Sequence, residues 1–136
     1  MSDHIKWEVV AGVVIKKDDK YLLVQEIGPR ARGLWNWPSG RVEQGDTIEE
    51  TAVKEAKEET GYDVKLIRKI GIFQIDINTP PKHSYEAEIV GGELDYPKNE
   101  IMNAKWFTLV EIKNMKDKLR GEWITGAIEI LEKMND

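Results

Sequence analysis

Three glutamates with helical spacing, Glu55, Glu58 and Glu59, are the residues of this chain best suited to chemistry. Residues three and four apart on a helix have Cβ atoms about 5–6 Å apart, so the three carboxylates would form one cluster. Each like-charged pair costs on the order of 3–4 kcal/mol, unscreened, at an effective dielectric near 20. Protonation, pairing with Lys or Arg, or a divalent cation relieves this repulsion, and Mg²⁺ prefers such hard oxygen ligands.

The acidic cluster also has a simpler interpretation, because acidic runs on helices usually face solvent. Glu50 with Lys54, and Lys54 with Glu58, are ordinary i,i+4 ion pairs of an exposed helix. On a helical projection, however, Glu59 lies about 40° from the centre of the apolar arc and Glu55 about 80°. That arc consists of Ile48, Ala52, Val53 and Ala56. Two of the carboxylates should therefore face inward or along the rim of the buried face.

The helix that carries the glutamates has sequence signals at both ends. Thr47 and Glu50 form a capping box, so we expect the helix to begin at about Thr47. Gly61 suits the left-handed position that ends a helix, which gives a length of about 14 residues. In front of it, Gly40 and Gly45 give the loop free backbone geometry. A glycine-containing loop thus leads directly into an acidic helix.

The stretch from Gly40 to Tyr62 resembles the signature of the Nudix hydrolases. That signature is a glycine, five residues, a glutamate, seven residues, and then Arg-Glu-apolar-any-Glu-Glu-any-Gly-apolar. Here Gly40 is followed at the same spacings by Asp46 and by Lys54-Glu55-Ala56-Lys57-Glu58-Glu59-Thr60-Gly61-Tyr62. Three residues depart from the pattern: Asp46 replaces the first glutamate, Lys54 replaces the arginine, and Ser39 stands where a second glycine often precedes the motif.

The resemblance implies a metal-dependent hydrolase that cleaves a diphosphate bond in a nucleoside diphosphate linked to another group. A (d)NTP or related nucleotide is the default substrate. The implied ligands of Mg²⁺ or Mn²⁺ are Glu55, Glu58, Glu59 and the backbone carbonyl of Gly40. Asp46 and Lys54 would support this site.

The proton of the attacking water would pass to Glu58 or Glu100, and Glu93 is the rival of Glu100. A Nudix-shaped nucleotide-binding or regulatory module without turnover is the alternative. It is motivated by Lys54, because a lysine supplies only a point charge where a guanidinium would hold the carboxylates through several donors.

Candidate substrate-binding residues lie outside the motif. Arg30 and Arg32 occupy a basic loop, and guanidinium groups match phosphate geometry, although a solvated loop explains them equally well. Trp37, like Trp35, is a candidate for stacking on a base, but packing in the core is the interpretation that we favour. His83 has no carboxylate nearby in sequence, so we expect no catalytic role for it.

Composition narrows the class of protein. With 136 residues, 40% hydrophobic and 33% charged, we expect one soluble domain spanning residues 1–136. A net charge of −5 argues against binding of long nucleic acid and leaves small nucleotides as partners. No apolar run approaches the ~20 residues of a membrane span and the N-terminus lacks secretory features, so we expect a cytoplasmic protein, monomeric or homodimeric. The absence of cysteine excludes a thiolate nucleophile.

Strands are expected before and after the acidic helix. An apolar period of two predicts the following strands: Ile5 to Ile15, with a possible bend at Gly12; Tyr21 to Ile27; one or two between Tyr62 and Asn78, broken at Gly71; His83 to Val90; and Ala104 to Phe107. The first two form a hairpin around the turn at 17–20.

Helices are expected to close the chain. A second capping box at Thr108 opens a helix of about ten residues, and an amphipathic helix follows from Trp123 to Leu131. This order predicts an α+β fold with a mixed sheet, which agrees with the α/β/α sandwich that the resemblance implies.

Overall fold

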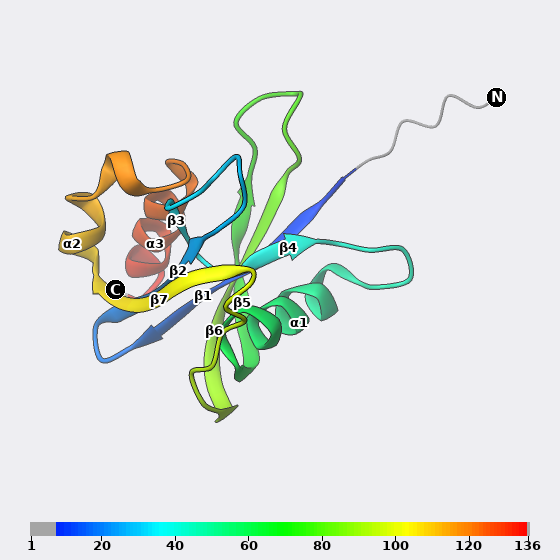
Figure 1. The fold of residues 1–136 in the computed structure, drawn as a ribbon, viewed down its shortest axis with the longest axis horizontal. Coiled ribbons are helices and arrows are strands. Elements are labelled where there is room, and N and C mark those ends of the chain that lie inside the picture. The colour runs from blue at the N-terminus through cyan, green and yellow to red at the C-terminus, as the bar shows by residue number, and fades with distance from the viewer. Residues whose placement is uncertain (1–7, 136) are drawn as a thin grey trace.

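The computed structural model describes residues 8–135, which form a mixed sheet between helices (Figure 1). The strands are β1 (Val10–Lys17), β2 (Lys20–Glu26), β3 (Trp35–Asn36), β4 (Ser39–Arg41), β5 (Tyr62–Phe73), β6 (Lys82–Gly92) and β7 (Ile101–Thr108). The helices are α1 (Ile48–Thr60), α2 (Leu109–Lys113) and α3 (Trp123–Met134), with a 3₁₀ turn η1 (Lys116–Lys118). No helix within 8–135 is long and apolar enough to cross a membrane.

The strands are joined in the order β3-β2-β1-β6-β5, with β4 paired to β1 and β7 paired to β2. Strands β1 and β6 run parallel, in register from Val10 opposite Lys82 to Ile15 opposite Ala87. The other pairings are antiparallel. The predicted mixed sheet is therefore confirmed.

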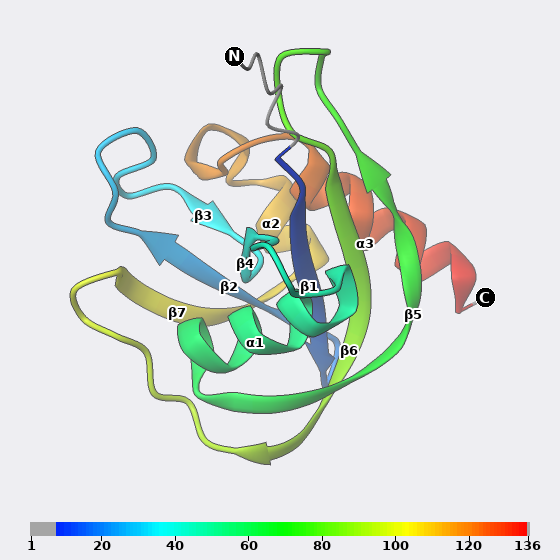
Figure 2. The ribbon, with the colours of Figure 1, turned by 90° about the vertical axis from the view of Figure 1, so that its right-hand side faces the viewer.

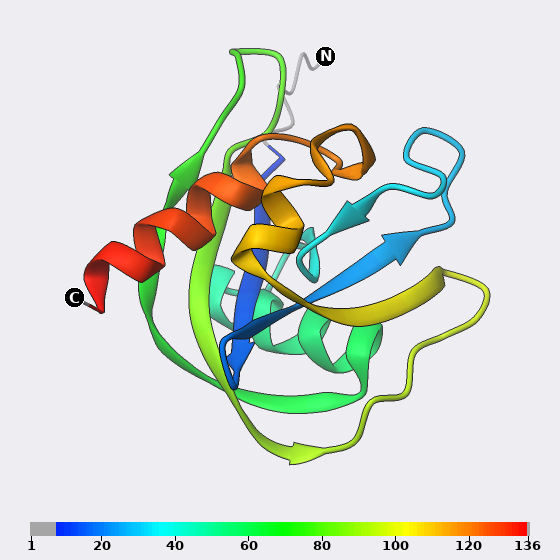
Figure 3. The same cartoon turned by 90° about the vertical axis from the view of Figure 1, so that its left-hand side faces the viewer.

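Helices cover both faces of the sheet, α1 on one face and α2 and α3 on the other (Figures 2 and 3). The alternation within β1 explains this, because Ala11, Val13 and Ile15 pack with Ala52 and Ala56 of α1. On the opposite face, the core joins residues of β1 and β2 to α3: Val14, Tyr21, Leu23, Ile124, Ile128 and Leu131. The α+β sandwich predicted from the sequence is confirmed.

Local signals place α1 as expected. The Thr47 hydroxyl accepts the Glu50 N–H at 3.0 Å, and the Glu50 carboxylate accepts the Thr47 N–H at 2.9 Å. Gly61 ends the helix in the left-handed region at φ +85°. Its N–H donates to the carbonyl of Lys57 at 2.9 Å. Both ends of the helix that carries the glutamates are thus fixed by short-range hydrogen bonds.

Several predicted boundaries are wrong. The first strand begins at Val10 rather than Ile5, and residues 5–7 lie outside the described part of the chain. One strand, β5, continues through Gly71, with a register shift between Lys69 and Gly71. Ile75 and Ile77, expected in a strand, are 63% and 91% exposed in the turn before β6. The apolar alternation in the sequence thus extends beyond Phe73, where the pairing of β5 with β6 ends.

The end of the chain also differs from the prediction. Strand β7 begins at Ile101 instead of Ala104, because it pairs with β2 over its whole length. Helix α2 begins at the predicted capping box but has five residues instead of about ten. It gives way to the 3₁₀ turn, and Leu119 then forms a parallel bridge with Trp35. A tertiary contact thus overrides the helical preference of this segment.

Substitution of Gly61 by Ala should lower the free energy of unfolding by about 3 kcal/mol or more, through left-handed strain and a clash. A Cβ there would lie 2.4 Å from the Glu93 carbonyl oxygen. Gly45 provides the control, since φ is +96° but the space around it is open, so Gly45→Ala should cost about 1 kcal/mol. Chemical denaturation measures both, and equal losses would contradict this account of the α1 terminus.

Candidate active site

The acidic end of α1 lies against β4. Gly40 of β4 pairs with Ala11 of β1, and a Cβ added at Gly40 would lie 1.8 Å from Oε1 of Glu55. The Glu55 carboxylate therefore occupies the space that any side chain at position 40 would fill. This contact brings together two of the predicted metal-site positions from opposite ends of the motif.

Two carboxylates of α1, Glu55 and Glu59, hold protons unusually tightly. Burial, followed by a hydrogen bond to Glu58 and its negative charge, raises the pKa of Glu55 to about 7. Burial, followed by the negative charges of Glu55 and Glu26, raises the pKa of Glu59 well above its ordinary value, although the Ser39 N–H opposes this. Glu58 is exposed. Ionising all three groups together is thus unfavourable unless positive charge is supplied.

The donor set fits a hard divalent cation, because carboxylate oxygens and a backbone carbonyl are its usual ligands. The residues that could hold it are Glu55, Glu58, Glu59 and Gly40. Within residues 8–135, no group of three or more acidic, histidine or cysteine side chains is arranged so that it could hold a metal ion. Instead, Glu55 and Glu58 share a hydrogen bond.

Two of the three departures from the motif, Asp46 and Lys54, interact with each other. Lys54 Nζ lies 3.9 Å from Oδ2 of Asp46, and both side chains are partly exposed. The positive charge of Lys54 still lowers the pKa of Glu55, against the larger effect of burial. Asp46 and Lys54 therefore link the loop to the helix beside the carboxylates, and their role in supporting a metal site stays a prediction.

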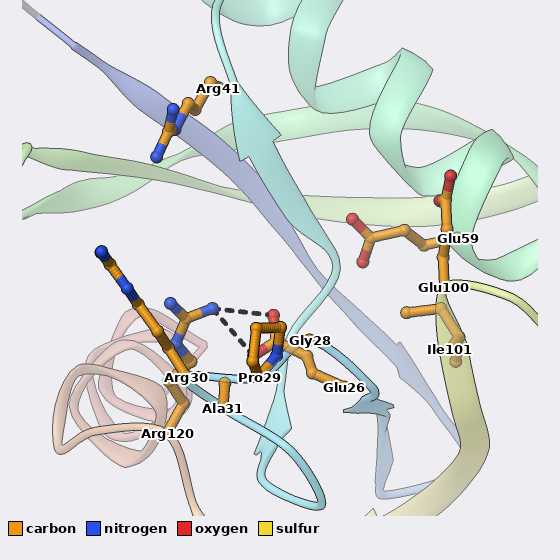
Figure 4. Close-up of a pocket in the computed structure, with 10 residues that line it drawn as sticks. All are labelled: Glu26, Gly28, Pro29, Arg30, Ala31, Arg41, Glu59, Glu100, Ile101 and Arg120. Carbon is orange, nitrogen blue, oxygen red and sulfur yellow. Dashed lines mark hydrogen bonds and ion pairs between the residues drawn. The ribbon is translucent and has the colours of Figure 1, made fainter.

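A cavity of about 490 Å³ adjoins the cluster, with Glu59 and Glu100 on one side (Figure 4). The negative charge of Glu100 contributes to the raised pKa values of Glu55 and Glu59. Glu93 instead lines a separate cavity with Lys16 and Tyr62. Of the two rival glutamates, the structure thus brings Glu100 to the cluster and keeps Glu93 away from it.

Guanidinium groups form the opposite side of this cavity (Figure 4). Arg30, a predicted substrate-binding residue, is among them, together with Arg41 and Arg120. The exposed Arg32 instead donates to the Ile27 carbonyl at 3.3 Å and does not line the cavity. The structure thus separates Arg32 from Arg30, because the Arg32 side chain folds back onto its own loop, and substrate binding by Arg32 stays a prediction.

Sequence reasoning missed Arg41, Arg120 and Glu26. Arg120 Nη1 donates to both carboxylate oxygens of Glu26, at 3.0 and 2.8 Å. Burial raises the pKa of Glu26, while Arg120 lowers it. No local signal could have found a pair 94 residues apart, whereas Arg41 directly follows Gly40 and could have been noticed.

The aromatic candidates belong to the core. Trp37 is 1% exposed and packs over Gly12, where an added Cβ would lie 2.3 Å from its ring. Stacking of Trp37 on a base, one of the predicted substrate contacts, is therefore wrong, and core packing is confirmed. Nδ1 of His83 lies 2.7 Å from Nζ of Lys69, and burial followed by the charge of Lys69 lowers the pKa of His83 against an opposing effect of Glu49.

A model of the NUDIX domain family matches residues 6–125. The chain is 34% identical over 125 residues to a Caenorhabditis elegans relative provisionally named nudix hydrolase 1, covering 89% of this chain and 34% of the relative. It is 35% identical over 94 residues to a Bacillus subtilis relative provisionally named 8-oxo-dGTP diphosphatase, covering 69% and 61%. This chain thus spans less than two thirds of either relative.

Two further proteins extend the comparison. The ADP-ribose pyrophosphatase of Methanocaldococcus jannaschii is 35% identical over 125 residues, with 83% of this chain and 72% of that protein covered. A NUDIX hydrolase from Nitrosomonas europaea superposes with a TM-score of 0.83 at 30% identity, covering 95% of this chain and 90% of the other. The fold and the motif thus point to the same family.

The metal-free protein should lose stability relative to Glu55→Gln as the pH rises from about 4.5 to 7. The folded state binds the Glu55 proton more tightly than the unfolded state does. Protonation of Glu55 therefore stabilises the fold fully below pH 4.5, and this stabilisation is lost as the pH rises from about 4.5 to 7. At pH 8 we expect the variant to be more stable by about 1–2 kcal/mol, allowing for solvent screening.

Denaturation in EDTA between pH 4 and 8 measures this difference. Glu111→Gln is the control with the opposite sign. The capping hydrogen bonds from the Thr108 backbone and side chain lower the pKa of Glu111, so the wild type should gain stability relative to Glu111→Gln as the pH rises. A pH-independent difference between wild type and Glu55→Gln would contradict the assigned coupling.

Proposed function

Since the chain belongs to the NUDIX domain family, we propose that it is a metal-dependent hydrolase that cleaves a diphosphate bond in a nucleoside diphosphate linked to another group. One observation carries the proposal: the Glu55 carboxylate is packed against Gly40 beside Glu58 and Glu59, and the pKa values of Glu55 and Glu59 are raised. Buried like charges at the edge of a cavity are typical of a functional site.

We assign Glu55, Glu58, Glu59 and the Gly40 carbonyl as the residues that hold Mg²⁺ or Mn²⁺. When bound, such an ion neutralises phosphate oxygens and lowers the pKa of a coordinated water. Glu59 lines the cavity, Glu55 packs against Gly40, and Glu58 is exposed to solvent. Glu58 or Glu100 accepts the proton of the attacking water.

A small nucleotide is the proposed substrate. Two of the relatives are named for 8-oxo-dGTP and ADP-ribose, which are both nucleoside diphosphate derivatives. The cavity of about 490 Å³ is in the range of small-molecule sites. Arg30 beside it supplies a guanidinium for phosphate oxygens.

Glu59→Gln should lower kcat by about 10²–10⁴-fold while leaving the fold intact, because Gln keeps the shape but removes the charge. Glu49→Gln, an exposed position at the start of the same helix, is the matched control and should retain full turnover. Product release from a nucleotide panel, with Mg²⁺ or with EDTA, measures the effect. A thermal shift with nucleotide but no product in any condition would identify a binding module instead.

Separate variants distinguish the two candidate bases. When the residue that accepts the proton is changed to Gln, the pH profile of kcat should lose its acidic limb. The variant of the other residue should retain that limb. Glu58→Gln and Glu100→Gln therefore form a matched pair, measured from pH 5 to 9 at saturating metal. If both variants keep the limb, neither carboxylate is the base.

A further inference from the structure

The segment between β6 and β7, residues 93–100, carries Glu100 to the candidate site. It runs past the C-terminal end of α1 and is attached there (Figure 2). The Asp95 N–H donates to the carbonyl of Thr60 at 2.8 Å, and Thr60 directly follows Glu59 in the sequence. One hydrogen bond thus ties the segment to the residue next to a helix glutamate.

The backbone of the segment also lies directly on the end of α1. A Cβ added at Gly61 would lie 2.4 Å from the carbonyl oxygen of Glu93 and 2.8 Å from the backbone nitrogen of Asp95. A Cβ added at Gly92 would lie 2.4 Å from the carbonyl oxygen of Gly61. Because two glycines let the backbones meet without side chains between them, the start of the segment is held close to the helix.

Tyr96 anchors the middle of the segment. Its ring is half-buried and packs against the core cluster that contains Ala52 and Ala56 of α1 and Ile101 of β7. Nζ of Lys98 lies 3.6 Å from the centre of the same ring, where an ammonium group is attracted to the aromatic face. The ring is therefore fixed by the core and by a cation from its own segment.

A tight turn connects this anchor to Glu100. The carbonyl of Pro97 accepts the N–H of Glu100 at 3.1 Å and the N–H of Ile101 at 2.8 Å. Ile101 is 4% exposed and lies opposite Glu26 of β2. The backbone of Glu100 is thus fixed from both sides, by the start of β7 after it and by the turn that follows Tyr96 before it.

We propose that Tyr96 is a positioning residue, which holds Glu100 at the cavity beside Glu59 before substrate binds. The segment 93–100 is then a fixed arm of the site and not a lid that closes over the substrate. A group held in place in this way reacts without the entropic cost of ordering a loop in each turnover. The inference rests on the proposed function, because it gives Glu100 a part in the hydrolysis.

Amide hydrogen exchange of the metal-free protein tests the anchor without any turnover. In Tyr96→Ala, the amides of Asp95 and Glu100 should exchange at least about tenfold faster than in the wild type, because their hydrogen bonds open when the segment detaches. Tyr96→Phe keeps the ring and should exchange like the wild type. Leu109→Ala, at a half-buried position in the core on the opposite face of the sheet, is the control and should leave both amides unchanged. Unchanged exchange in Tyr96→Ala overturns the inference.

Turnover shows whether the anchor acts through Glu100. Tyr96→Ala should lower kcat about tenfold and change KM less than about threefold, since the segment places a reacting group and does not hold the substrate. In the Glu100→Gln background, the same substitution should cause no further loss, because the group that it positions is already gone. Tyr96→Phe and Leu109→Ala should both retain the wild-type kcat.

The outcomes separate this inference from the proposed function. The inference is overturned by an unchanged kcat in Tyr96→Ala, by an equal loss in the Glu100→Gln background, or by full turnover of Glu100→Gln itself. Metal-dependent hydrolysis by the wild type stands in all three cases. If the wild type hydrolyses no nucleotide with Mg²⁺, the proposed function fails, and hydrogen exchange alone decides whether Tyr96 fixes the segment.

Discussion

The close approach of α1 to the backbone of β4 is the constraint on which the candidate site depends. Ala52 and Ala56 are fully buried and let the helix lie near the sheet, and Gly40 leaves room for the Glu55 carboxylate. Because β4 is paired with the central strand β1, the carboxylate is held against a part of the structure that cannot easily move away. Burial, raised pKa values and demand for positive charge all follow from this packing.

The parts of the fold that the sequence predicted well are those set by neighbours in the chain. Both capping boxes, the left-handed Gly61 and the alternation of β1 depend on residues within a few positions of one another. The same is true of the glutamate cluster, whose members lie on one helix. The predicted boundaries were wrong where a residue distant in sequence determines them. Helix α2 ends early because Leu119 pairs with Trp35, and β7 begins early because it pairs with β2.

The residues of the candidate site likewise differ in whether neighbours in the sequence could reveal them. The α1 glutamates of its acidic side, Glu55, Glu58 and Glu59, are close in sequence, and their spacing could be recognised without a structure. Its basic side is assembled from Arg30 after β2, Arg41 in β4 and Arg120 before α3, which come together only when the sheet forms. Guanidinium type alone did not identify them, since Arg32 has the same chemistry and the same loop as Arg30 but turns back to the Ile27 carbonyl.

Opposite charges face each other across one cavity, yet the basic side does not neutralise the acidic side. Arg120 is engaged by both oxygens of Glu26, and its N–H is fixed by the carbonyl of Trp35 at 2.9 Å. Nη1 of Arg41 lies 3.3 Å from Oε1 of Glu8. Because these two arginines have carboxylate partners of their own, they are not available to neutralise Glu55 and Glu59, and burial followed by the charge of neighbouring carboxylates raises the pKa of both.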